Sequence, residues 1–209
     1  VLNNTVIGNH GPANATIAGV AMIGTPPFHH NNLYGNERYD VLVVSTQDIS
    51  GTHNYWGTTS NEDIQEQVYD WYDDGLRGRL LLSPYLEDPD PLAPVPPPLN
   101  LTGDWQDDSV SLTWDPIPST TTSYGYKVYY DSDRAGPPYD GTGLDQGDSP
   151  VDVSSLTEYT LTGLVELTPY YTAVTAREMP GREGWYSAEV NNLATFAHFV
   201  HLPLIVRPY

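Results

Sequence analysis

An asparagine followed by apolar residues and then a glycine recurs three times in the first 57 residues of the chain. The copies are "NNTVIGN" at 3–9, "NNLYGN" at 31–36 and "HNYWG" at 53–57. Aligned on Asn4, Asn32 and Asn54, they are spaced by 28 and 22 residues. Asparagine tolerates the left-handed backbone of a corner and can stack its amide on the asparagine above. A period in the twenties with β-rich runs between the anchors predicts a solenoid of β coils.

Two of those runs, "ATIAGVAMI" at 15–23 and "YDVLVVS" at 39–45, are predicted strands of the coils. The segment that follows, "NYWGTTSNEDIQEQVYDWYDDGLRGRLLLSPYL" at 54–86, resembles the closing segment of right-handed parallel β-helix proteins of the pectin-lyase-like kind. The resemblance covers about residues 1–86. It implies a short end of a parallel β-helix closed by a capping α-helix.

The predicted capping helix begins after Thr59 or Ser60, either of which can cap it, because an acidic residue follows three positions later. Its apolar face and its wet face are then assigned by helical spacing. The apolar face comprises Ile64, Val68, Trp71 and Tyr72, and the wet face comprises Asp70, Asp73 and Asp74. We expect "RLLLS" at 79–83 to return as a strand that ends at Pro84.

The first coil lacks such a cover in the sequence. Val1 falls inside a strand-like pattern, so we expect a processed product or one piece of a longer chain. An uncovered coil exposes a row of backbone donors and acceptors that favours pairing. Either upstream coils or a neighbouring molecule should complete this end.

The pattern changes after "EDPDPLAPVPPP" at 87–98, which predicts an extended, semi-rigid spacer. Beyond it, alternating runs predict antiparallel strands. These runs are 109–114, 124–131, 158–164, 170–178 and a last strand within 184–195.

This second part resembles a fibronectin type III domain over about residues 95–195. Trp114 sits where that fold has its core tryptophan, and Leu164 and Tyr170 match its tyrosine corner. The resemblance also assigns inner rows to two strands. The rows are Tyr126, Val128 and Tyr130 on one strand, and Thr172, Val174 and Ala176 on the other. Such domains space, present and bind, and rarely catalyse.

Charge and composition exclude several functions. The chain has 8 Lys and Arg against 27 Asp and Glu, a formal net charge of −19, which repels nucleic acids and anionic membranes. It has no cysteine, so disulfides and thiol catalysis are excluded. No apolar run approaches the ~20 residues of a membrane-spanning helix.

The search for catalytic groups starts from the pectin-lyase-like resemblance, because such solenoids often cleave polysaccharides. The coils contain one cation, Arg38, and three carboxylates, Glu37, Asp40 and Asp48. The spacing of the three carboxylates allows them to converge on one face but does not require it. We expect solvated turn residues and no enzyme, with a polysaccharide lyase or glycoside hydrolase as the minority interpretation. No catalytic or cofactor-binding residue is predicted.

Other chemistry-bearing residues lie in loops. The acidic insertion at 131–148 offers Asp140, Asp145 and Asp148 as candidate calcium ligands, although their spacing is not that of an EF-hand. His29 and His30 are adjacent and therefore make a poor chelate. Three sequons mark candidate glycosylation sites, at Asn3, Asn14 and Asn100.

The chain closes with "FVHLPLIVRPY" at 199–209, whose alternation predicts a strand with one aliphatic face. Three coverings fit this tail: its own subunit, a sorting system that reads it as a tag, or a neighbouring subunit through donor-strand complementation. The predicted subunit-interface residues are Val200, Leu202, Leu204, Ile205 and Val206. Pro203 removes one ladder hydrogen bond, so its nitrogen must face away from the partner strand or lie at a bend.

The sequence thus predicts an all-β chain in four parts: 1–86, β-helix coils with a capping helix; 87–98, a linker; 99–195, a fibronectin type III-like domain; and 196–209, the tail. We expect a secreted structural protein at the cell surface or outside the cell that assembles head-to-tail into a filament of identical subunits, because such contacts do not close. The alternative is the C-terminal remnant of a modular protein that binds or degrades polysaccharide. Partners are then identical subunits or surface polysaccharide.

Overall fold

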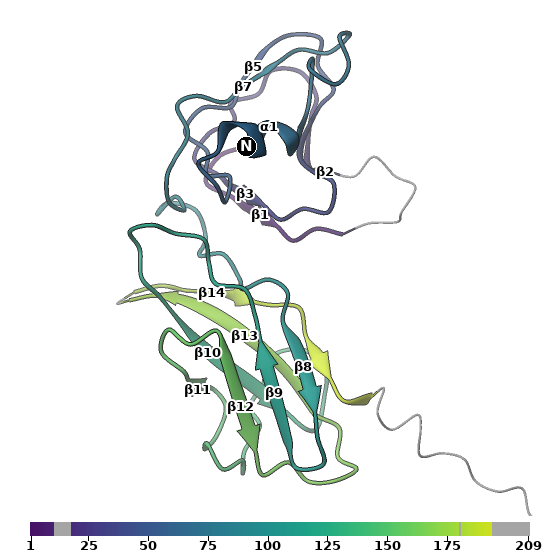
Figure 1. The fold of residues 1–209 in the computed structure, drawn as a ribbon, viewed down its shortest axis with the longest axis vertical. Coiled ribbons are helices and arrows are strands. Elements are labelled where there is room, and N and C mark those ends of the chain that lie inside the picture. The colour runs from purple at the N-terminus through teal and green to yellow at the C-terminus, as the bar shows by residue number, and fades with distance from the viewer. Residues whose placement is uncertain (11–17, 180, 194–209) are drawn as a thin grey trace, which may run out of the picture.

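The computed structural model of the 209-residue chain describes residues 1–10, 18–179 and 181–193. Figure 1 shows two modules placed end to end, with the linker between them. We call residues 1–86 the N-terminal module and residues 99–191 the sandwich. Within the described residues, no helix has the length and apolar character needed to cross a membrane.

The N-terminal module is built from short strands that pair in parallel. One sheet has β1 (Thr5–Ile7) and β3 (Asn32–Tyr34); a second has β2 (Ala18–Met22), β4 (Tyr39–Val43) and β6 (Val68–Tyr69); a third has β5 (Ile49–Ser50) and β7 (Leu80–Leu81). Parallel bridges at Asn32–Tyr55 and Tyr55–Leu86 extend the stacking. The parallel sheets are therefore fragments of two or three strands. Strands β2, β4 and β7 lie inside the strand segments that the sequence predicted.

Two asparagine ladders link the coils of this module. In the first, Asn31 Oδ1 accepts from the backbone N of Asn4 at 3.0 Å and from its Nδ2 at 3.3 Å. Asn31 in turn donates from its backbone N at 3.0 Å and its Nδ2 at 2.9 Å to Asn54 Oδ1. The predicted anchor Asn32 was therefore wrong by one residue. Asn32 belongs to β3, and its amide oxygen accepts from the backbone N of Asp90 in the linker at 2.7 Å.

The second ladder runs through Asn9, Asn36 and Asp40. Asn36 Oδ1 accepts from the backbone N of Asn9 at 3.1 Å and from its Nδ2 at 2.7 Å. Asn36 donates to Asp40 Oδ1 in the same way, at 3.3 Å from its backbone N and 2.7 Å from Nδ2. Each ladder step thus satisfies two donors with one side-chain oxygen, which a buried corner requires.

Helix α1 (Asn61–Glu66) is shorter than the predicted capping helix. Ser60 is its N-cap, with the side chain accepting from the backbone N of Asp63 at 3.3 Å, as expected for one of the two proposed caps. Ile64 is buried at 1% exposure, but Val68 has left the helix and begins β6. The helix ends early because β6 pairs with β4, and this pairing takes the backbone out of the helical conformation.

Of the predicted wet face, Asp73 is exposed and Asp74 is half-buried, but the prediction was wrong for Asp70. Its side chain is fully buried, and its Oδ2 accepts from the backbone N of Leu80 at 2.8 Å. Its Oδ1 accepts from the backbone N of Tyr72 at 3.0 Å. Trp71 and Tyr72, predicted on the buried face, are 41% and 65% exposed.

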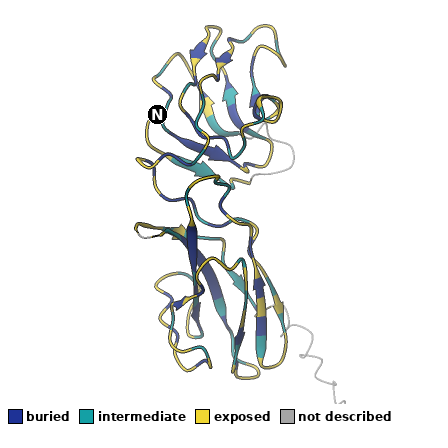
Figure 2. Cartoon of the chain, turned by 60° about the vertical axis from the view of Figure 1, so that its left-hand side comes forward, coloured by how far each residue is buried: buried dark blue, intermediate teal, exposed yellow. Residues whose placement is uncertain are grey.

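The core of the N-terminal module collects side chains from every coil. Dark blue segments of Figure 2 mark the buried residues of both modules. The core residues of the N-terminal module are Met22, Phe28, Leu33, Val41, Val43, Ile49, Trp56, Ile64, Val68, Leu80 and Leu82. At about 25 cal/mol per Å² of apolar surface, each fully buried aliphatic side chain contributes roughly 1.5–3 kcal/mol.

The sandwich consists of two antiparallel sheets. The smaller has β8 (Thr102–Trp105), β9 (Ser109–Thr113) and β12 (Glu158–Thr162); the larger has β10 (Tyr124–Asp131), β11 (Val151–Asp152), β13 (Tyr171–Glu178), β14 (Glu183–Tyr186) and β15 (Val190–Asn191). The single last strand predicted within 184–195 is in fact two short strands, β14 and β15, both paired with β13. A register shift between Thr175 and Arg177 breaks the pairing with β14.

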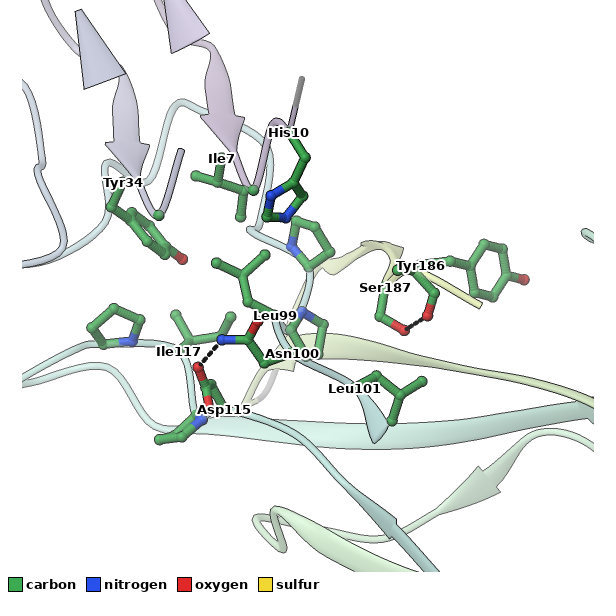
Figure 3. Close-up of a pocket in the computed structure, with 17 residues that line it drawn as sticks. Ile7, His10, Tyr34, Leu99, Asn100, Leu101, Asp115, Ile117, Tyr186 and Ser187 are labelled. Atoms are coloured by element: carbon green, nitrogen blue, oxygen red, sulfur yellow. Dashed lines mark hydrogen bonds between the residues drawn. The ribbon is translucent and has the colours of Figure 1, made fainter. Parts of the chain in front are cut away.

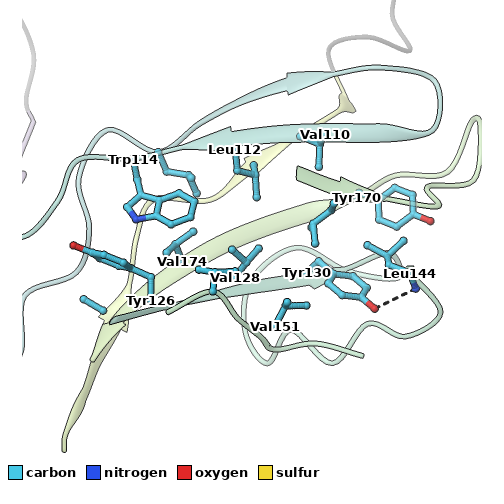
Figure 4. Packing of buried hydrophobic residues seen from close by; sticks show 14 of the residues in the cluster. Val110, Leu112, Trp114, Tyr126, Val128, Tyr130, Leu144, Val151, Tyr170 and Val174 are labelled. Carbon is cyan, nitrogen blue, oxygen red and sulfur yellow. Dashed lines mark hydrogen bonds between the residues drawn. The ribbon is translucent and has the colours of Figure 1, made fainter. Parts of the chain in front are cut away.

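The predicted inner rows fill the space between the two sheets (Figure 4). Val128 and Val174 are fully buried, and Trp114 packs edge-on against Tyr126 at 5.7 Å between ring centroids. The hydroxyl of Tyr170 accepts from the backbone N of Val165 at 3.1 Å, which is the predicted tyrosine corner.

The linker is not a free spacer, because it packs on both modules. Ala93 and Val95 are buried at 0% and 4% exposure. The carbonyl oxygen of Pro94 accepts from Thr5 Oγ1 at 2.6 Å, and that of Ala93 accepts from Arg182 at 2.9 Å. The linker is not extended throughout, because the backbone N of Ala93 donates to the carbonyl of Asp90 at 3.1 Å in a turn. The neighbouring modules supply the donors to the carbonyls of Ala93 and Pro94.

Candidate functional site

The first coil presents an open edge. Among the described residues, β1 pairs only with β3 and β2 only with β4, so one side of each strand has no partner. Both ladders also begin here. Interior ladder oxygens accept two hydrogen bonds each, whereas Asn4 Oδ1 and Asn9 Oδ1 accept none from the described residues. We call β1, β2 and these two amides the open coil edge.

Apolar side chains flank the open coil edge. Val1 and Leu2 are 45% and 44% exposed, and Ile23, which follows β2, is 78% exposed. Unpaired backbone beside exposed aliphatic side chains is the arrangement that β-strand addition uses.

A second feature is the junction between the modules, where Asp88 acts as a latch. Its two carboxylate oxygens accept from the hydroxyls of Ser119, Thr120 and Thr121, at 2.6, 3.1 and 2.6 Å. Burial acts to raise the pKa of Asp88, but these hydrogen bonds and those from backbone N–H groups outweigh it and hold the pKa well below its usual range. Tyr55 adds a contact by donating its hydroxyl to the carbonyl of Pro118.

His30 fastens the linker on its other side. Its Nδ1 lies 2.7 Å from Asp90 Oδ2, and its ring stacks on His53 at 5.9 Å. His29 meets His30 edge-on at 5.1 Å. His30 therefore links the N-terminal module to the linker, and His29 packs against the His30 ring.

A cavity of about 630 Å³ lies at the same junction (Figure 3). The N-terminal module, the linker and the sandwich all contribute to its wall, through residues such as Tyr34, Leu99 and Asp115. The hydroxyl of Tyr34 is buried and has no hydrogen-bond partner among the described residues, and burial raises the pKa of this phenol well above its ordinary value.

The structure does not gather the candidate calcium ligands. Asp140 lies 3.9 Å from Arg134, Asp145 accepts from Thr162 Oγ1 at 2.8 Å, and Asp148 lies 3.4 Å from the backbone N of Gly143. No three His, Cys, Asp or Glu side chains in the described parts of the chain are grouped to hold a metal ion. The sequence predicted no metal site and offered these three aspartates only as weak calcium candidates. In the described residues each of them has a separate contact.

The coil carboxylates also have separate positions. Asp40 is buried at 1% exposure and ends the second ladder, and Asp48 Oδ1 accepts from the backbone N of Arg79 at 2.8 Å. The expectation of a solvated turn residue was therefore wrong for Asp40. Glu37 donates its backbone N–H to the carbonyl of Asn9 at 2.9 Å.

Of the three sequons, Asn3 and Asn100 are exposed and have left-handed backbones, with φ of 55° and 54°. Asn100 donates to Asp115 Oδ2 at 2.7 Å. Asn14 lies outside the described residues. So do the predicted interface residues Val200, Leu202, Leu204, Ile205 and Val206.

The comparison with protein families decides the nature of the sandwich. The family profile described as "Fibronectin type III domain" matches residues 96–191. Residues 96–191 form a fibronectin type III domain. The match begins three residues before the predicted domain and ends four residues before its predicted end.

This part of the chain is also similar to solved structures. A Fn3-like protein from Clostridium thermocellum is 28% identical, with 47% of this chain and 90% of that chain covered and a TM-score of 0.34. The FN3 domain of human collagen XX is 20% identical, with 47% and 90% covered and a TM-score of 0.36. None of the curated proteins matches the chain.

Fibronectin type III domains are generally non-catalytic, which is consistent with the absence of a predicted catalytic residue in this segment. The fibronectin type III domain supplies Ser119, Thr120 and Thr121 to the latch and Asp115 to the cavity. Sequence reasoning missed Asp88 and Asn31 as organising residues. The second ladder was visible in the sequence, since both "NNTVIGN" and "NNLYGN" end in asparagine.

Proposed function

We propose that this chain is a secreted structural subunit whose N-terminal module is the end of a right-handed parallel β-helix, and that subunits join by β-strand addition at the open coil edge. The parallel pairing of every strand in the N-terminal module supports the β-helix. The two asparagine ladders support it further, because stacked amides at corners hold successive coils in register.

The observation that carries the assembly proposal is the start of both ladders, where two amide oxygens accept no hydrogen bond from the described residues. Asn4 Oδ1 and Asn9 Oδ1 lie five residues apart, at the two ends of β1. A strand added beside β1 supplies backbone N–H groups to both oxygens and pairs with the free side of β1. Adding this strand also covers the exposed Val1 and Leu2.

The proposed donor is the C-terminal tail of a neighbouring copy. Its aliphatic row, Val200, Leu202, Leu204 and Val206, offers four side chains to bury. Full burial contributes roughly 5–10 kcal/mol before ordering costs. Because the donor and the acceptor are different segments of the chain, this contact repeats into a head-to-tail filament at the cell surface or outside the cell.

Deleting residues 198–209 tests the proposal. The full chain should sediment as a concentration-dependent series of species and form filaments in negative stain, whereas the deleted chain should sediment as a monomer. A control chain with Arg207→Gln and Tyr209→Ser keeps the aliphatic row and should still assemble. Filaments from the deleted chain, or a monomeric full chain at all concentrations, would overturn the proposal.

A further inference from the structure

The cavity at the junction has the properties of a ligand site, and it shares Ile7 of β1 with the open coil edge. Its volume of about 630 Å³ falls in the range of small-molecule pockets, and such pockets prefer domain interfaces. The figure shows side chains of both modules facing one another across it (Figure 3).

Tyr34 provides the first polar group. The residue is 8% exposed, and its hydroxyl lacks a hydrogen-bond partner in the structure. In Figure 3 its ring reaches from the N-terminal module toward the space between the modules. The ring is fixed by an edge-on contact with Tyr55 at 5.8 Å, and Gly57 leaves room for its Cβ. Because the buried phenol stays protonated, it is a positioned donor for a ligand oxygen.

Asp115 provides the second polar group, from the fibronectin type III domain. One of its carboxylate oxygens accepts from Asn100 Nδ2 at 2.7 Å, and its side chain faces the cavity from the opposite module (Figure 3). Asp115 is exposed, so its carboxylate remains an acceptor for a ligand hydroxyl.

The apolar wall between these groups is rigid. Leu99 packs so tightly on the coils that a Cβ at Gly8 or Gly35 would lie 2.7 Å from its methyl groups. Ile7 and Ile117 complete this wall. A rigid apolar surface with a few polar groups is the usual form of a preformed site.

An exposed tryptophan stands at the rim. A second groove of about 400 Å³ shares Ile7, Pro97 and Tyr186 with the cavity and adds Trp185, which is 73% exposed. An indole face at a wet rim can stack on the apolar face of a ligand ring.

We propose that the junction binds a neutral, hydroxyl-rich ligand, namely a short stretch of uncharged oligosaccharide. A sugar hydroxyl can accept from Tyr34 and another can donate to Asp115, while ring C–H groups lie on Leu99 or Trp185. An anionic sugar is disfavoured because the chain carries a net charge of −19 and the cavity itself holds a carboxylate.

The test is isothermal titration calorimetry on the full chain. The neutral probes are cellohexaose, xylohexaose and maltohexaose, and the charged probe is trigalacturonic acid. At least one neutral probe should bind. Tyr34→Phe should weaken that binding about five- to tenfold, because it removes one hydrogen bond. Tyr72→Phe is the matched control at an exposed tyrosine and should bind as the unmodified chain does.

A stability measurement separates a binding role of the hydroxyl from a structural one. Because the Tyr34 hydroxyl has no partner, Tyr34→Phe should unfold at the same temperature as the unmodified chain or higher. Trp185→Ala should weaken binding at least tenfold, with Trp71→Ala as the exposed-tryptophan control. Three results would overturn the proposal: no neutral probe binds at millimolar concentration, trigalacturonic acid binds most tightly, or Tyr34→Phe binds as the unmodified chain does.

Discussion

Asn31 shows how a single buried residue holds several coils together. It is fully buried, accepts two hydrogen bonds from Asn4 and donates two to Asn54. Asn4 belongs to the same ladder but is exposed at its start. The recurrence of asparagine was predictable from the sequence. Which of two adjacent asparagines turns inward was not, because that depends on where β3 begins.

Asn31→Ala should destabilise the chain by about 3 kcal/mol, since it leaves buried donors and acceptors unpaired. Asn4→Ala is the matched control and should cost less than about 1 kcal/mol, because its backbone N–H still donates to Asn31. Urea unfolding of both variants measures the difference. Equal losses of unfolding free energy in the two variants would show that the asparagine ladder does not stabilise the fold.

Asp40 makes the free energy of unfolding depend on pH. Burial raises its pKa to about 6 from an ordinary value of 3.8, against the lowering effect of the hydrogen bonds from Asn36. The folded state therefore binds the proton more tightly than the unfolded state does. The stabilisation of the folded state by this proton is fully present below about pH 4 and is lost as pH rises through 6.

Asp40→Asn removes the titrating group and keeps the Oδ1 acceptor. The stability of this variant relative to the unmodified chain should rise by about 2–3 kcal/mol between pH 4 and pH 8. Urea unfolding across that range measures the change, and the difference between the two chains cancels the pH effects of other carboxylates. A difference that stays constant with pH would contradict the assignment.

At the scale of elements, local sequence patterns predicted where an element begins better than where it ends. Ser60 begins α1 as the capping pattern predicts, but the apolar spacing that continues through Val68 and Trp71 belongs to a turn and a strand. The pairing of β6 with β4, distant in sequence, decided where the helix ends. In the fibronectin type III domain, alternation located β10 fully, but it missed the two-residue strand β11, which is too short to show a period.

The cap itself can be tested with its neighbour as control. Ser60→Ala should destabilise the N-terminal module by about 1 kcal/mol, because the backbone N of Asp63 loses its acceptor. Thr59→Ala should be nearly neutral, since the contact made there, from Tyr85, uses the backbone carbonyl of Thr59. Thermal unfolding of the two variants distinguishes them, and a larger loss for Thr59→Ala would reverse the cap assignment.

At the scale of the whole molecule, the linker joins the modules instead of separating them. Proline content predicted an extended segment, but the linker contains a turn that Ala93 closes on Asp90. The sequence also could not show that Asp88 and Asp90 bind opposite modules, because those contacts depend on tertiary arrangement. The cavity at the junction was unpredictable for the same reason. The tail residues at 198–209 lie outside the described part of the chain, and their donor role stays a prediction.

The latch predicts how the junction responds to mutation. Asp88→Ala removes the acceptor for Ser119, Thr120 and Thr121 and should make the linker several-fold more sensitive to proteinase K. Asp104→Ala, an exposed aspartate within β8, is the control and should leave cleavage unchanged. Unchanged cleavage in Asp88→Ala would mean that other contacts hold the modules.

Assembly through the open coil edge is tested most directly by disulfide trapping, because the chain has no cysteine of its own. One chain carries Leu2→Cys, at an exposed position next to β1, and a second chain carries Leu204→Cys in the tail. On mixing and mild oxidation, we predict a mixed dimer in much higher yield than for Leu204→Cys with Val165→Cys, an exposed position on the fibronectin type III domain. Equal yields for the two pairs would contradict tail-to-edge assembly. So would a chain carrying both the edge cysteine and Leu204→Cys that stays a monomer and forms only an internal disulfide.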